Sequence, residues 1–325
     1  MSVYLLRRIL YAIPILIGVN LITFALFFVV NTPDDMARMQ LGVKRVTPEA
    51  IQKWKQERGY DKPLLFNSAS QGVSKIKDTI FFDKSLRLFV FDFGRAEDGR
   101  DIGHEIRMRM GPSLAIALPG FIVGLAAYVT FSLILALMRA TYVDFTAVIF
   151  CIAAMSISGM FYIIGGQFLV SKLWRLVPIS GFSEGLAAWK FVVLPVVIGL
   201  VGAVGERTRW YRTIFLEEIG KDYVRTARAK GLSEMQVLFG HVLRNALIPI
   251  LTGVVVAIPA LFLGSLLTES FFAIPGLGSY TIDAISSQDF SVVRAMVFLG
   301  AVLYVIGLML TDVAYTVADP RIRLQ

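Results

Sequence analysis

The N-terminal part of the chain reads Ile9-Leu-Tyr-Ala-Ile-Pro-Ile-Leu-Ile-Gly-Val-Asn-Leu-Ile-Thr-Phe-Ala-Leu-Phe-Phe-Val-Val30 and contains no Lys, Arg, Asp or Glu. A helix needs about 20 apolar residues to cross the hydrocarbon core of a bilayer, and this stretch is long enough. A cleaved signal peptide would have a shorter apolar core and an Ala-x-Ala site, whereas Asn31, Thr32 and Pro33 follow here. We therefore interpret residues 9–30 as a retained membrane span.

Five more apolar stretches repeat this pattern. Hydrophobic residues make up 56% of the chain and charged residues only 17%, against about 25% charged residues in average soluble domains. Lipid offers no partner to exposed backbone groups, so we expect each span to be a helix. The predicted fold is all-α, a polytopic membrane protein with six transmembrane helices at about residues 9–30, 112–138, 145–170, 191–205, 246–268 and 295–311.

Positive charges in the short loops predict the orientation, because Lys and Arg are enriched on the cytoplasmic side. They favour both termini inside, since one side of the predicted spans holds Arg7, Arg8, Arg139, Arg321, Arg323 and the basic residues of 206–245. The expected organisation is a cytoplasmic N-terminus with the first span (1–30), a periplasmic segment or subdomain (31–111), and a five-helix transmembrane core (112–325) with a cytoplasmic loop at 206–245. The net charge of +8 is attributed to such loops, and nucleic acid is not expected as a partner.

Catalytic chemistry has few candidate residues in this chain. There is one cysteine, Cys151, and there are two histidines, both outside the predicted spans. The phosphate-binding pattern Gly-x-x-x-x-Gly-Lys-Ser/Thr does not occur, and His104-Glu105 is not part of a His-Glu-x-x-His zinc motif. We expect no catalytic residue, no metal site and no cofactor bound by this chain.

The loop at 206–245 contains a predicted helix–turn–helix. Gly231 suits the left-handed position after a helix over 222–230. Ser233 and Gln236 have the spacing of a capping box, so a second helix is expected from Glu234. Small Ala227 and Ala229 would let another backbone approach, and apolar side chains are expected on display at Met235, Val237, Leu238 and Phe239. From these residues alone, a docking knob for a soluble partner and a plain solvated loop are equally open.

The stretch Tyr223-Val-Arg-Thr-Ala-Arg-Ala-Lys-Gly231, followed by Pro249, resembles the signature loop of ATP-binding-cassette (ABC) importer permeases. More narrowly, it is similar to the dipeptide/oligopeptide/nickel permease family. Other stretches resemble further motifs of that family, namely Gly59-Tyr-Asp-Lys-Pro-Leu64, Asp92-Phe-Gly-Arg95, Glu269-Ser-Phe-Phe-Ala-Ile-Pro-Gly-Leu-Gly278 and Asp312-Val-Ala-Tyr-Thr-Val-Ala-Asp-Pro-Arg321. One departure is Thr32-Pro-Asp-Asp35, which lacks the glycine of the family's Pro-Gly-Asp.

The resemblance implies a type I ABC importer permease in a bacterial inner membrane. Such a chain is a non-catalytic subunit that forms half of the pathway for peptides or a related small solute. The implied partners are a second homologous permease chain, two ABC ATPases that bind ATP and Mg²⁺, a periplasmic substrate-binding protein and membrane lipid. The ATPases would dock on residues 222–245, with coupling assigned to Tyr223, Thr226, Ala227, Arg228, Ala229, Gly231, Ser233, Glu234 and Met235.

Three residues are candidates for the translocation pathway or its gate. Glu269 lies at the outer end of the fifth span, where an ionisable group is often functional but can also be hydrated. Ser156 and Gly159 are small residues of the third span, for which close helix packing is the competing interpretation. The alternative function is a self-sufficient secondary transporter or channel, which would predict charges near the bilayer midplane. The cargo stays open among peptides, opines, nickel chelates and glycans.

Overall fold

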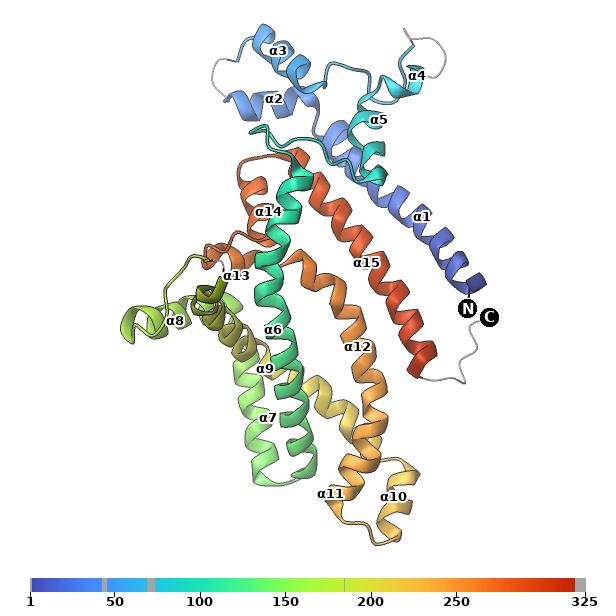
Figure 1. The fold of residues 1–325 in the computed structure, drawn as a ribbon, viewed down its shortest axis with the longest axis vertical. Coiled ribbons are helices and arrows are strands. Elements are labelled where there is room, and N and C mark those ends of the chain that lie inside the picture. The colour runs from blue at the N-terminus through green and yellow to red at the C-terminus, as the bar shows by residue number, and fades with distance from the viewer. Residues whose placement is uncertain (1, 43–45, 69–73, 184, 319–325) are drawn as a thin grey trace. The chain divides into compact units, whose positions relative to one another are not determined.

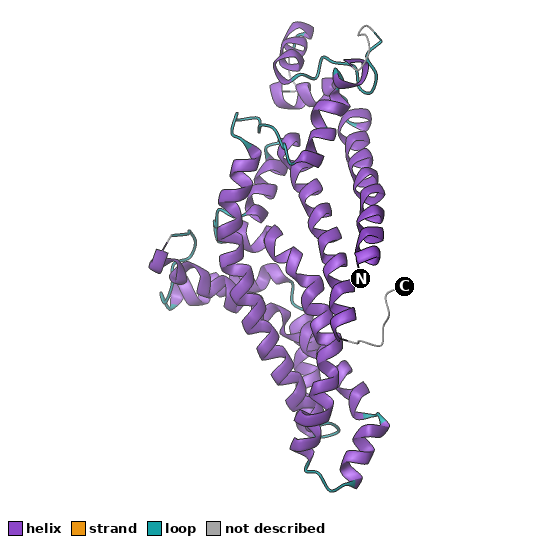
Figure 2. Cartoon of the chain, turned by 45° about the vertical axis from the view of Figure 1, so that its right-hand side comes forward, coloured by secondary structure: helices purple, strands orange, loops and turns teal. Residues whose placement is uncertain are grey.

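The computed structural model of the chain describes residues 2–42, 46–68, 74–183 and 185–318. The motif ending at Arg321 and the charge of Arg323 lie partly or wholly outside these ranges. The described residues form helices and loops without a strand, as Figure 2 shows, apart from one isolated bridge between Arg95 and Asp101. The predicted all-α class is thereby confirmed.

Five helical stretches of the described residues are long and apolar enough to span a membrane. They are Arg7–Val30, Ile102–Leu137, Trp189–Ile219, Glu234–Phe271 and Phe290–Ala314. Four of them contain the predicted spans 9–30, 191–205, 246–268 and 295–311, and Ile102–Leu137 covers the predicted span 112–138 up to residue 137. Residues 112 and 205 are far from the ends of their helices. The stretch Trp189–Ile219 also carries the helix well into the block that the sequence assigned to the cytoplasmic loop 206–245.

The third predicted span, 145–170, is the exception. Two helical stretches, Tyr142–Met155 and Gly159–Leu173, meet there at an angle of 88°, so a single continuous helix is wrong. Ser158 has extended backbone angles and Gly159 starts the new helix. Serine and glycine are weak interior helix formers, which explains why the chain breaks at this point. The number of spans is six if the bent pair is counted as one.

Two compact units divide the chain by its internal contacts. Unit 1 comprises residues 1–109 and 280–306, and unit 2 comprises residues 110–279 and 307–325. The long helices α6 (Ile102–Leu137), α14 (Leu277–Ser286) and α15 (Phe290–Ala318) each contribute to both units. The assignment of residues 31–111 to the periplasm stays a prediction.

Unit 1 begins with α1 (Ser2–Ala25), which continues as a π-helix over Leu26–Val30. Short capped helices follow, because Thr32, Thr47 and Thr79 each accept a hydrogen bond from the backbone of the following first turn. The capped helices are α2 (Pro33–Leu41), α3 (Pro48–Arg58) and α5 (Ile80–Lys84). The helix α4 (Ser74–Lys77) and a 3₁₀ turn over Leu86–Val90 lie in the same stretch.

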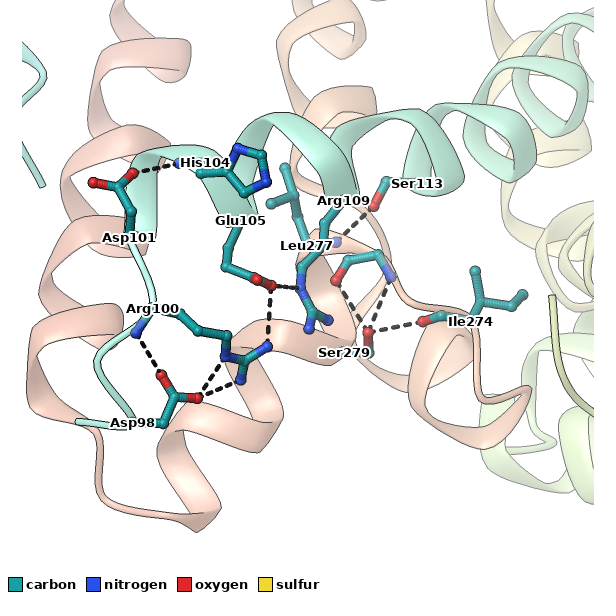
Figure 3. Close-up of polar contacts among 11 residues, drawn as sticks. Asp98, Arg100, Asp101, His104, Glu105, Arg109, Ser113, Ile274, Leu277 and Ser279 are labelled. Atoms are coloured by element: carbon teal, nitrogen blue, oxygen red, sulfur yellow. Dashed lines mark hydrogen bonds and ion pairs between the residues drawn. The ribbon is translucent and has the colours of Figure 1, made fainter. Parts of the chain in front are cut away.

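An aromatic core joins the short helices of unit 1 to the end of α1. The Phe28 ring lies 5.0 Å from Phe24 and 5.5 Å from Tyr60, and the Trp54 ring lies 5.5 Å from Tyr60 at a tilt of 46°. Ion pairs fix the connection into α6, since Glu105 contacts Arg109 at 2.8 Å and Arg100 at 3.3 Å (Figure 3). The segment after the first span is therefore folded against the end of that span.

Unit 2 is built from α6, α7 (Tyr142–Met155), α8 (Gly159–Gly166), a π-helix over Gln167–Leu173, a 3₁₀ turn over Gly185–Ala188, α9 (Trp189–Ile219), α10 (Asp222–Ala229), α11 (Glu234–Val237), a π-helix over Leu238–Leu243, α12 (Arg244–Leu263) and α13 (Leu266–Phe271). Figure 1 shows α10 and α11 together at one end of this unit. The apolar cluster at that end draws side chains from α6, α9, α10 and α12, including Leu133, Phe215, Val224 and Ala246.

Candidate functional site

The turn between α10 and α11 forms as the sequence predicts. Gly231 has a left-handed φ of 79°, and its N–H donates to the carbonyl of Arg228 at 2.9 Å. The Ser233 N–H donates to Gln236 Oε1 at 3.0 Å, while the Gln236 N–H donates to Ser233 Oγ at 3.4 Å. This reciprocal pair is a capping box. The helix stop at Gly231 and the helix start at Glu234 are both confirmed.

The second helix is longer than expected. It runs from α11 through the π-helix Leu238–Leu243 directly into α12, and Pro249 lies inside α12. The apolar stretch Glu234–Phe271 thus joins the end of unit 2 to the span itself. We call residues 222–245 the coupling segment.

One face of the coupling segment is buried within unit 2. Val224, Ala227, Val237 and Leu238 are almost fully covered and belong to the apolar cluster with α6 and α9. The expectation that Val237 and Leu238 are displayed to a partner is therefore wrong, because they face the chain's own core. The small side chain of Ala227 lets α10 pack closely against this core. Ala227 is buried there, so it would support a partner contact from behind and would not touch the partner itself.

The opposite face is open. Met235 is 54% exposed and Phe239 is 51% exposed. The small and polar residues of the coupling segment that are also exposed include Thr226, Ala229, Gly231, Ser233 and Glu234. The outward face of the coupling segment thus combines an exposed apolar pair with small and polar residues.

Polar contacts hold the coupling segment to its neighbours. Arg228 and Glu234 form a two-pronged ion pair, with distances of 2.8 and 3.0 Å, across the turn. The Tyr223 hydroxyl donates to Glu218 of α9 at 2.5 Å, and Lys221 pairs with the same carboxylate. Burial, followed by the hydrogen bond to Glu218, raises the pKa of Tyr223 to about 12. The hydroxyl therefore keeps its proton, and its hydrogen bond, at neutral pH.

Glu269, the first gate candidate, is buried, with only 1% of its surface exposed. Its two carboxylate oxygens accept hydrogen bonds at 3.1 Å, one from the Ser265 N–H and the other from the Ser279 N–H. A Cβ on Gly264 would lie 2.0 Å from one of these oxygens, and a Cβ on Gly276 would lie 2.2 Å from the other. We call these five residues the Glu269 corner. Its glycines leave the room that the carboxylate fills.

Side chains around the Glu269 corner complete its hydrogen bonding. Figure 3 shows Ser113 of α6, whose Oγ accepts from the Leu277 N–H at 2.8 Å. The Ser279 hydroxyl donates to the carbonyl of Ile274 at 2.8 Å. The Pro-Gly-Leu-Gly stretch is therefore tied to α6 and α13 by the chain's own groups. A gate role for Glu269 is a separate matter and stays a prediction.

The other two gate candidates flank the break between α7 and α8. Ser156 is exposed and its Oγ donates to the carbonyl of Ile152 at 2.9 Å. Gly159 is exposed as well, and a Cβ added to it would meet no atom within 4 Å. Close helix packing therefore does not explain Gly159 in this chain. Glycines that do permit close packing between helices include Gly166, against Ile198, and Gly205, against the carbonyl of Cys151.

A buried ion pair escaped the sequence analysis. Asp144 of α7 accepts two hydrogen bonds from the Arg212 guanidinium of α9, at 2.9 and 2.7 Å. It also accepts from the Ala140 N–H at 3.2 Å, and Thr141 caps the same helix. The cap pattern Thr141-x-x-Asp144 was the available signal for the carboxylate. Nothing in the sequence indicated its partner, because Arg212 lies far along the chain in a helix that was predicted to end at residue 205.

An all-helical chain with repeated apolar spans and a capped helix–turn–helix packed on its own core defines a polytopic membrane subunit. Residues 108–324 match the family described as the inner membrane component of binding-protein-dependent transport systems. Residues 1–85 match the N-terminal region of the corresponding membrane components. The chain belongs to this family and is a permease component of an ABC importer in the inner membrane.

Curated relatives agree over nearly the whole chain. The dipeptide transport system permease protein DppB of Escherichia coli is 29% identical, covering 98% of this chain and 98% of its own. A putative peptide transport system permease protein of Brucella abortus is 30% identical, covering 99% of each. A probable peptide ABC transporter permease protein of Sinorhizobium fredii is 29% identical over 99% of this chain. These relatives support the importer permease over a self-sufficient secondary transporter or channel.

Proposed function

We propose that the outward face of the coupling segment docks on a partner ABC ATPase and that this chain forms half of an import pathway for peptides or related small solutes. The observation that carries the proposal is the division of the segment into two faces. The inward residues Val224, Ala227 and Val237 are locked into unit 2. The outward residues Met235 and Phe239 are left open, together with small residues of the same segment.

This division into a buried and an exposed face suits a segment on which a partner protein such as an ATPase pushes. The inward face packs against α6, α9 and α12, so a push on the outward face moves these helices instead of bending a loop. The Arg228–Glu234 pair and the Tyr223–Glu218 hydrogen bond keep α10 and α11 in one arrangement. A plain solvated loop would need neither the shared core nor these ties.

Cargo and partners follow from the relatives. Their names assign transport of dipeptides or peptides to them, and we extend peptide cargo to this chain. We further propose that a second homologous permease chain completes the pathway and that a periplasmic substrate-binding protein delivers the cargo. Two ATPase subunits would hold ATP and Mg²⁺, because this chain has no phosphate-binding loop.

Site-specific photocrosslinking tests the docking face. A photoreactive amino acid at Met235, in the assembled transporter, is expected to yield a covalent product between this chain and the ATPase. The matched control is Leu176, which is 69% exposed and is predicted to lie on the outer side. Equal ATPase crosslinking from both positions, or none from Met235, would show that the coupling segment is not the docking site.

A further inference from the structure

A polar cavity of about 170 Å³ lies within unit 1, beside the 3₁₀ turn Leu86–Val90 and the start of α15. This is several times the volume of one water molecule in the liquid, about 30 Å³. Six charged residues line it, four of them basic: Asp83, Lys84, Arg87, Asp92, Arg95 and Arg294. The cavity wall therefore carries an excess of positive charge.

Both carboxylates of the cavity are already paired. Asp83 contacts Lys62 at 2.7 Å and Arg87 at 3.3 Å, and Asp92 contacts Arg87 at 3.6 Å. Arg87 thus bridges the two acids. The basic charge that remains to face the cavity belongs to Lys84, Arg95 and Arg294.

Arg294 is the most deeply placed of these cations, since it is only 4% exposed. Its guanidinium lies over the Phe28 ring, 4.7 Å from the centroid. Its N–H groups donate to the carbonyl of Phe290 at 3.1 Å, to the carbonyl of Lys84 at 3.4 Å and to Ser291 Oγ at 3.4 Å. All of these acceptors are neutral. In the described part of the chain, no carboxylate lies within ion-pair distance of Arg294.

Lys84 lies beside Arg294, whose guanidinium donates to the Lys84 carbonyl, and it likewise has no direct ion pair within the ranges that the structure describes. Its ammonium lies 5.2 Å from the centroid of the Tyr60 ring, and among the described residues it makes no ion pair within 4 Å. Burial, and then repulsion from Arg294, lower the pKa of Lys84. Asp289 and Glu97 act on Arg294 from beyond 4 Å, and Asp83 and Glu97 act on Lys84 in the same way. Without a direct ion pair, buried Arg294 and partly buried Lys84 remain costly beside one cavity. An anion within the cavity would offset that cost.

We propose that this cavity binds a phosphate-type anion, supplied either by a phospholipid headgroup or as inorganic phosphate. Arginine forks and lysine ammonium groups are the usual ligands of phosphate oxygens in proteins. Arg294 lies within the stretch Phe290–Ala314, near its beginning, and Phe28 lies near the end of Arg7–Val30. The cavity therefore lies at the ends of two predicted spans, where phospholipid headgroups are found.

Thermal stability of the full-length chain in detergent provides the test. The chain is titrated in one arm with inorganic phosphate and in the other with a short-chain phosphatidylglycerol, each against chloride at equal ionic strength. A ligand that binds only the folded state raises the unfolding temperature in a saturable way. The variants are Lys84→Gln, Arg95→Gln and the control Lys53→Gln, which removes an exposed charge of α3 away from the cavity.

Wild type and Lys53→Gln are expected to be stabilised by at least one ligand, and the apparent Kd is expected to weaken about tenfold or more in each cavity variant. A response to lipid alone identifies the headgroup as the source, and a response to inorganic phosphate alone identifies the free anion. Arg95 is exposed, so its variant tests the site even if Lys84→Gln alters the fold. No response in wild type, or wild-type affinity in both cavity variants, would overturn the site.

Discussion

Burying the Glu269 carboxylate costs free energy, yet the packing around it requires that carboxylate. Its carboxylate is fully covered, yet both oxygens receive backbone N–H groups from Ser265 and Ser279. Gly264 and Gly276 leave space that any Cβ would fill. A carboxylate buried in this way holds two turns in one arrangement, because it is the acceptor that both turns share.

The Glu269 corner predicts a specific intolerance at Gly276. The variant Gly276→Ala places a Cβ 2.2 Å from the Glu269 carboxylate and 2.5 Å from Ser113 Oγ. We expect it to lower the free energy of unfolding by about 1–3 kcal/mol, the usual cost of overpacking. Thermal denaturation in detergent would measure the change.

Gly199→Ala is the control for that experiment. Gly199 lies within α9, and an added Cβ would meet no atom within 4 Å. Alanine there is expected to be neutral or to stabilise the helix by up to about 1 kcal/mol. Equal destabilisation by the two variants would contradict the steric explanation.

The Asp144–Arg212 pair makes a second prediction at the level of single residues. Asp144→Ala and Arg212→Ala are each expected to cost about 3 kcal/mol, because each leaves a largely buried charge alone. The double variant should cost clearly less than the sum. The control is Asp222 with Arg225, which is largely exposed and should show a coupling below about 0.5 kcal/mol. A double-mutant cycle on thermal stability measures both; additivity at Asp144 and Arg212 would exclude the coupling.

At the scale of elements, the coupling segment depends on one backbone conformation. Gly231 has a φ of 79°, and an added Cβ would meet no atom within 4 Å. Within this chain, a Cβ there causes backbone strain but no clash. The shape of the turn can thus be changed without disturbing contacts inside the chain.

The variant Gly231→Val is expected to impair uptake coupled to ATP hydrolysis, because a β-branched residue in the left-handed region costs about 1–2 kcal/mol and distorts the turn. Gly231→Asn should retain most of the activity, since asparagine tolerates this conformation. Uptake by the reconstituted transporter is the measurement. Wild-type uptake in the valine variant would count against the proposed geometry of the coupling turn.

The elements also show what the sequence could predict and where it stopped. Capping chemistry is local, so Gly231, Ser233 and Gln236 were sufficient to place the turn. The break at Ser158 was not predicted, because the residues on both sides of it are apolar and composition alone does not indicate a bend between two apolar helices. The inward facing of Val237 and Leu238 depends on packing against Phe215 of α9, which no local pattern reveals.

For the whole molecule, the spans were predictable because the hydrocarbon core imposes length and composition on each of them. Which helices pack against each other was not predictable, since contacts such as that of Gly205 with Cys151 depend on the shapes of the helix surfaces. The cavity beside Arg294 could not be predicted from the sequence either. It draws charges from around residue 90 and from residue 294, and only the folded unit 1 brings them together.

A prediction at this scale concerns the chain in isolation. Reconstituted alone into liposomes, it should not move peptide down a concentration gradient, because an importer permease needs its partners to form and drive the pathway. The complete assembly with ATP is the positive control. Facilitated peptide flux through the isolated chain would favour the self-sufficient transporter or channel.

The continuity of α11 and α12 has a mechanical consequence. From Glu234 to Leu263 the helix is about 45 Å long, at about 1.5 Å per residue. Tilting a helix of this length by about 5° about its end in the coupling segment displaces its far tip by about 4 Å. That tip ends at Gly264, inside the hydrogen-bonded Glu269 corner. The helix is continuous from the coupling segment to the Glu269 corner, so that corner is where a movement begun at the coupling segment would arrive.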